Sequence, residues 1–94
     1  MSYEPELTDE AVEDFRALID SLPASRRRDA RDAVELALTR LAASPLLASK
    51  QHLGRPTYQF QFSAEGVAHH WACTFVFDED EARIRITHIY RVGM

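Results

Sequence analysis

Strict alternation of apolar and polar side chains in the last third of the chain constrains the fold more than any other feature. It runs through residues 57–63, 67–77 and 82–92, which are separated by Gly66 and by the acidic run 78–81. A period of two with one apolar face is typical of an antiparallel sheet that is covered on one side. The residues expected on the covered face are Tyr58, Phe60, Phe62, His69, Trp71, Cys73, Phe75, Phe77, Ala82, Ile84, Ile86, His88 and Tyr90.

The segment that precedes Pro23 has the apolar spacing of a helix. Val12, Phe15 and Leu22 recur at helical intervals, so one face of the segment is apolar. Thr8 is the expected N-cap, and the acidic residues that follow it suit the positive end of the helix dipole. Pro23 ends this helix, because a residue before proline is disfavoured in the helical conformation.

A second helix is expected at 25–43, with an alanine-rich apolar stripe and a stop at Pro45. Because few residues link the two helices, they should be antiparallel neighbours, and they must cover the apolar face of the sheet. A short edge strand at 3–7 and a loop at 44–56 complete the prediction. Residues 1–94 should thus form one α+β domain, with two antiparallel helices packed on one face of a mostly antiparallel sheet of three or four strands.

The composition limits where the protein acts and what it binds. A net charge of −4 over 94 residues weakens the case for a nucleic-acid ligand, although local arginine clusters keep that case open. No apolar run approaches the roughly 20 residues that span a bilayer, and no signal-peptide core is expected at the N-terminus. The single cysteine, Cys73, lies in an apolar strand and is expected to be buried and inert. We therefore predict a cytoplasmic protein without membrane contact.

The opposite face of the predicted sheet collects polar side chains that suit contact with phosphate. Arginine binds phosphate bidentately, and glutamine hydrogen-bonds bases or sugars. The alternative is a solvated face whose arginines pair with neighbouring acids. A separate arginine triplet at 26–28 is either solvated or in contact with an anion or a partner. The residues expected on the open sheet face are Gln59, Gln61, His70, Thr74, Arg83, Arg85, Thr87 and Arg91.

The four histidines, His52, His69, His70 and His88, are the candidate proton-transfer groups. Cleavage of RNA through its own 2′-hydroxyl needs a base, an acid and a cation, which histidine, tyrosine and arginine can supply. His69 and His70 point to opposite faces and cannot act together. His70 faces the arginines, whereas His88 falls on the covered face unless a bulge reorients it. No spacing matches a metal site, a phosphate loop or a nucleophile motif.

Short motifs follow one another along the predicted strands. Leu53-Gly54 precedes a Tyr-x-Phe-x-Phe run that starts at Tyr58, and an Ile-x-His-x-x-Arg run ends at Arg91. Together with the order of a short strand, two helices and a meander, these motifs resemble the RelE/ParE family of bacterial type II toxins over nearly the whole chain. The resemblance implies a toxin that a cognate antitoxin holds inactive. It implies either a ribosome-dependent mRNA endonuclease or a DNA gyrase poison.

The resemblance also implies roles for individual residues. An mRNA endonuclease would hold phosphate with arginines and would move protons with His70 or His88. Gln59 and Gln61 stand where the family usually carries lysine or arginine, which favours a non-enzymatic rival, either a gyrase poison or a protein-interaction module. No cofactor and no metal are expected. The predicted catalytic residues are His70, His88 and Arg91, and the predicted RNA- or phosphate-binding residues are Gln59, Gln61, Arg83 and Arg85.

Overall fold

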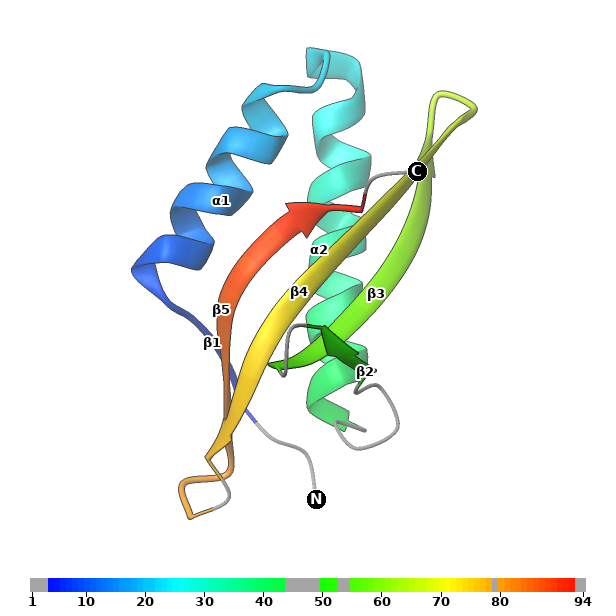
Figure 1. Cartoon of the computed structure of the whole chain (residues 1–94). Coiled ribbons are helices and arrows are strands. Elements are labelled where there is room, and N and C mark those ends of the chain that lie inside the picture. The colour runs from blue at the N-terminus through cyan, green and yellow to red at the C-terminus, as the bar shows by residue number, and fades with distance from the viewer. Residues whose placement is uncertain (1–3, 44–49, 53–54, 79, 93–94) are drawn as a thin grey trace.

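Two helices cover one face of a five-stranded sheet in the computed structural model, which describes residues 4–43, 50–52, 55–78 and 80–92 (Figure 1). The elements are β1 (Glu4–Leu7), α1 (Asp9–Asp20), α2 (Ala24–Ala43), β2 (Lys50–His52), β3 (Arg55–Ala64), β4 (Val67–Asp78) and β5 (Arg83–Arg91). The strand order is β1-β5-β4-β3-β2. Only β1 and β5 pair in parallel among these strands, and the other neighbours are antiparallel.

This architecture confirms the predicted α+β fold and adds one strand to it. A loop was expected over 44–56, but β2 lies within that segment and pairs with the first residues of β3. The strand expected at 3–7 is present as β1, and its Pro5 lies at the sheet edge, where a missing N–H breaks no ladder. Some residues to which the predictions refer lie outside the described part of the chain, namely Tyr3, Pro45, Leu53 and Gly54.

Thr8 fixes the start of α1 and ties it to the sheet. Its Oγ1 accepts the N–H of Ala11 at 3.2 Å, which is the expected N-cap contact. The same hydroxyl donates to the carbonyl oxygen of Ile86 at 3.0 Å. The backbone N–H of Thr8 donates to that oxygen as well, at 3.1 Å. The first turn of α1 is therefore held beside β5.

Arg27 fixes the turn between the helices. Its Nε donates to the carbonyl oxygens of Ile19 and Leu22 at 3.2 and 3.1 Å. Ile19 is in the last turn of α1, which carries no basic residue of its own, and Leu22 follows the C-cap Ser21. A cation at this position satisfies free carbonyls and opposes the negative end of the helix dipole. One member of the arginine triplet therefore has a structural role.

The core lies between the helices and the covered sheet face. Phe62 meets Trp71 edge to face, with ring centroids 4.9 Å apart. Both helices and four strands contribute to this single cluster, with β1 represented by Leu7. Six residues of the apolar helix and strand faces are at most 5% exposed, namely Val34, Leu41, Trp71, Phe75, Ile84 and Ile86, and Phe15, Leu18, Phe60 and Phe62 are partly buried against them.

A β-bulge interrupts the pairing of β4 with β5. Phe75 lies opposite Ile86, whereas the preceding residue, Thr74, lies opposite His88. Thr87 therefore has no residue of its own opposite it on β4. An extra residue of this kind reverses the alternation of the strand beyond it. His88 is exposed instead of lying in the core. The sequence allowed for a bulge that would reorient His88, and that bulge is present.

The residues after the bulge change faces. Ile89, which the alternation placed on the open face, is buried in the core. Arg91 lies opposite the buried Trp71 and therefore faces the helices. Tyr90 lies opposite Ala72 and is thereby turned to the open face. The predictions that placed Tyr90 on the covered face and Arg91 on the open face are wrong for this single reason.

Phe75→Ala should lower the free energy of unfolding by about 3–5 kcal/mol, because truncating a large core side chain leaves a cavity. Phe75 is 1% exposed, and its neighbour Val76 is 54% exposed on the opposite sheet face. Val76→Ala is therefore the matched control and should stay within about 0.5 kcal/mol of the wild type. Urea denaturation measures both. Equal losses for the two variants would contradict the register of β4.

Candidate functional site

Four side chains gather on the open face near one end of the sheet. Gln61 lies directly opposite His70 on the neighbouring strand, and Gln59 and Tyr90 lie on either side of Ala72. Because Ala72 is two residues from His70, Tyr90 is a diagonal neighbour of His70, at about 7–8 Å between Cα atoms. We call Gln59, Gln61, His70 and Tyr90 the open-face cluster.

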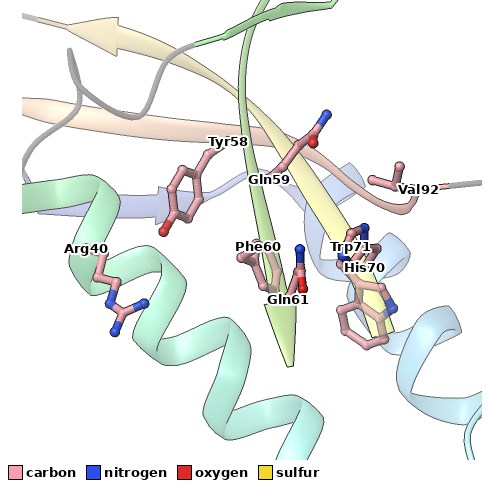
Figure 2. A pocket seen from close by; sticks show the side chains of 8 residues that line it. All are labelled: Arg40, Tyr58, Gln59, Phe60, Gln61, His70, Trp71 and Val92. Atoms are coloured by element: carbon pink, nitrogen blue, oxygen red, sulfur yellow. The ribbon is translucent and has the colours of Figure 1, made fainter. Parts of the chain in front are cut away.

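A groove of about 450 Å³ runs along this part of β3. Figure 2 shows its lining, with Arg40 and Tyr58 at one end and His70 and Val92 at the other. The three polar members of the cluster that line it are exposed to solvent. The groove can therefore admit a ligand that contacts an imidazole and two amides at once.

His88 stands apart from the open-face cluster. It lies opposite Thr74, four residues from His70 along β4, which corresponds to about 13 Å at about 3.3 Å per residue. Its Nδ1 lies 3.2 Å from Oδ2 of Asp14 in α1. The same carboxylate oxygen accepts the N–H of Ile89 at 3.2 Å. The structure does not bring the two candidate catalytic histidines together.

Arg83 and Arg85 lie at the far end of the sheet. Arg85 is opposite Val76, which is about 20 Å from His70 along the strand. Glu6 Oε2 pairs with both arginines, at 3.7 and 3.9 Å, and Glu81 pairs with Arg83 at 3.7 Å. These are exposed ion pairs of small energy. Here the alternative of a solvated face with paired arginines is confirmed.

Arg91 reaches the corner between the two helices. Its Nη2 donates to Oγ of Ser21, the C-cap of α1, at 3.1 Å. The Ser21 hydroxyl in turn donates to the carbonyl of Leu18 at 2.6 Å. Arg91 also lines a second cavity, of which His70 forms another wall. Arg91 therefore borders the open-face cluster from the helix side of the sheet.

His69 faces the helices, as the alternation predicted. Its ring stacks on Phe62 with centroids 4.9 Å apart, and its buried Nε2 has no hydrogen-bond partner among the described residues. Burial lowers the pKa of His69 below its ordinary value, and the nearby cations Arg26 and Arg91 lower this pKa further. The imidazole is therefore neutral at pH 7.

The described part of the chain gives little support to a reactive thiol, a metal site or a membrane-spanning helix. Cys73 is buried, as expected, and burial raises the pKa of its thiol to about 12, which disfavours the reactive thiolate. No three histidine, cysteine, aspartate or glutamate side chains converge on a metal position within the described residues. None of the helices that the structure describes is both long and apolar enough to cross a bilayer.

Tyr90 is the candidate that the alternation missed. A signal for it was nevertheless present in the sequence. Simple alternation of 82–92 puts the polar His88 among apolar residues and the apolar Ile89 among arginines. An exchange of polarity at two successive positions indicates that one residue has been inserted into the pairing.

Comparison with solved structures identifies the fold. The chain is similar to a chain of the toxin–antitoxin complex RelBE2 from Mycobacterium tuberculosis, with a TM-score of 0.64, 18% identity and coverage of 98% of this chain and 100% of the other. For a chain of the intact Escherichia coli RelBE complex, the TM-score is 0.62 and the sequence identity is 13%, with coverage of 99% of this chain and 100% of the other. For a mutant of the E. coli toxin RelE in the free state, the TM-score is 0.61 and the sequence identity is 11%, with coverage of 97% of this chain and 84% of the other. No protein-family model and no curated protein matches the sequence.

These likenesses extend over almost the whole chain at low sequence identity. They establish that the chain has the RelE-like toxin fold, which the order of its elements and its strand motifs predicted. The fold is shared although few individual residues are.

The stability of the protein should fall as the pH drops below about 6.5, the ordinary pKa of histidine. The pKa of His69 is lowered in the folded state, so the unfolded chain takes up its proton first and is favoured by acid. His69→Gln should flatten the dependence of the unfolding free energy on pH between 7 and 5.5, and His70→Gln is the exposed control. Denaturant titrations at each pH measure this. Identical slopes for the wild type and His69→Gln would contradict it.

Proposed function

We propose that this chain is the toxin component of a type II toxin–antitoxin system. The supporting observation is its whole-chain likeness to structures of RelE-like toxins, two of which are complexes with an antitoxin. The likeness covers 98% and 99% of this chain and the full length of both matched chains. A cognate antitoxin is the partner that this function requires.

The proposed activity is cleavage of mRNA at the open-face cluster. His70 would take the proton of the ribose 2′-hydroxyl, whose oxygen attacks the adjacent phosphorus, and Tyr90 would protonate the departing 5′-oxygen. Gln59 and Gln61 would donate hydrogen bonds to the phosphate oxygens. Arg91, which borders His70, would supply the cation that stabilises the extra negative charge of the transition state. His88, engaged with Asp14, would have no direct role.

A second candidate function is a non-enzymatic toxin or interaction module, with DNA gyrase as one target. A specific observation favours it. Gln59 and Gln61 are the only side chains that β3 contributes to the open-face cluster, and Arg83 and Arg85 are already paired with Glu6 and Glu81. None of the four cluster members is an arginine or lysine, so a phosphate bound there would need a cation from the border of the cluster, such as Arg91 or Arg40.

Expression of the chain without a partner should slow bacterial growth, and co-expression of the product of an adjacent gene should restore it. The reason is that a toxin is inactive only while its antitoxin is bound. Growth curves with and without the neighbouring gene measure both effects. Normal growth at high, soluble expression of the chain alone would contradict the toxin proposal.

Arg91→Ala should reduce mRNA cleavage about tenfold to a hundredfold, because a charge-assisted phosphate contact contributes on the order of 1.5–3 kcal/mol. His70→Gln and Tyr90→Phe should also lose cleavage. His88→Ala is the comparison variant and should keep cleavage. Mapping of mRNA ends in cells detects the cuts, and melting temperatures establish that each variant is folded.

The same variants separate the two candidate functions. If His70→Gln, Tyr90→Phe and Arg91→Ala are folded and as toxic as the wild type, the ribonuclease site is wrong. The gyrase function then predicts trapped DNA breaks in cells that express the wild-type chain. Absence of both mRNA cuts and DNA breaks would leave the interaction module.

A further inference from the structure

Residues of the α1–α2 turn, the start of β4 and the end of β5 line a second cavity. These segments lie toward the same end of the molecule (Figure 1). The volume of the cavity is about 670 Å³. Three elements bring basic side chains to it: α2 contributes Arg26, β4 contributes His69, and β5 contributes Arg91. We call these three residues and their cavity the basic corner.

Positive charge in the basic corner is only partly neutralised. No acidic residue lines the cavity. Glu65, at the β3–β4 turn, pairs with Arg26 at 3.2 Å from an exposed position. Arg91 donates to the neutral Ser21 hydroxyl and forms no ion pair with an acidic residue in the described part of the chain. The first turn of α2 also lies here without an acidic residue, so the positive end of that helix dipole adds to the potential.

His69 connects the two guanidinium groups. Both Arg26 and Arg91 are close enough to lower its pKa. Its Nε2 is buried without a partner among the described residues, and a buried polar atom in that state is costly. The ring is held by stacking on Phe62, and a half-turn about its terminal torsion keeps that stacking while it exchanges the positions of Nε2 and Cε1. A ligand oxygen in the cavity could therefore give this nitrogen its missing partner.

We propose that the basic corner binds the phosphate group of a nucleotide. Guanidinium groups bind phosphate oxygens through paired hydrogen bonds, and two of them flank the cavity here. Leu22, Pro23 and Ala68 add apolar wall, against which a ribose and base can pack. The volume lies within the usual range of small-molecule sites, about 300–1,000 Å³, and exceeds the needs of a single phosphate ion.

This site adjoins the proposed cleavage site, because Arg91 belongs to both and His70 also lines this cavity. Arg26 and His69, in contrast, take no part in the proposed cleavage. Binding at the corner does not require catalysis at His70. The corner would hold a nucleotide phosphate whether the chain cleaves RNA or acts through another target.

Titration followed by NMR tests the proposal, with the ring signals of His69 as the reporter. Uridine 3′-monophosphate should shift these signals and saturate at a lower concentration than inorganic phosphate, at constant ionic strength. Uridine, which lacks the phosphate, should not saturate. Equal effects of phosphate, acetate and chloride would overturn the proposal, as would binding of uridine as tight as that of the monophosphate.

Two opposite substitutions make the test specific. Arg26→Gln removes a guanidinium and should weaken binding of the monophosphate about tenfold or more. Glu65→Gln removes the carboxylate that competes for Arg26 and should tighten binding. Arg28→Gln, an exposed arginine of the same helix that does not line the cavity, should leave binding unchanged. Weakening of the same size in Arg26→Gln and Arg28→Gln, or weakening in Glu65→Gln, would overturn the proposal.

Discussion

The contact between Thr74 and Thr87 holds the bulge on which the arrangement of the functional candidates depends. The two hydroxyl oxygens lie 2.6 Å apart, and the Thr87 hydroxyl also approaches the carbonyl of Thr74 at 3.2 Å. These bonds engage the polar groups of the extra residue in a partly buried place, where unpaired groups are costly. Because of the inserted residue, every side chain of β5 after Thr87 lies on the sheet face opposite to the one that simple alternation predicts. The bulge is thus the reason that an imidazole and a phenol share one sheet face.

The sequence was sufficient to predict the parts of the fold that periodicity controls. The stripe of Phe15 and Leu22 and the alternation around Trp71 each identify an element and the face that it buries. The bulge could not be located this way, because it is a property of the pairing between two strands rather than of either strand alone. β2 was missed for a related reason, since its three residues are too few to show a period. The parallel pairing of β1 with β5 could not be predicted either, because the two strands are far apart in the sequence.

The candidate site was predictable only in part. Gln59, Gln61 and His70 precede the bulge, and their shared face follows from alternation. Arg83 and Arg85 share that face as well, but the length of the strands separates them from His70, and Glu6 of β1 engages them. A shared face therefore does not make a shared site. The basic corner joins residues from three elements, and only the packing of the helices onto the sheet brings Arg26 beside His69.

The position of β5 in the sheet has a consequence for how the protein is made. β5 lies between β1 and β4, and the contact of Thr8 with Ile86 joins residues 78 positions apart. On the ribosome, β1 emerges early and has no described strand to pair with until β5 leaves the exit tunnel. Nascent chains can form the helical hairpin and the β3–β4 hairpin beforehand, because those contacts are local. The complete sheet, and with it the faces that carry both sites, can form only once β5 has been synthesised.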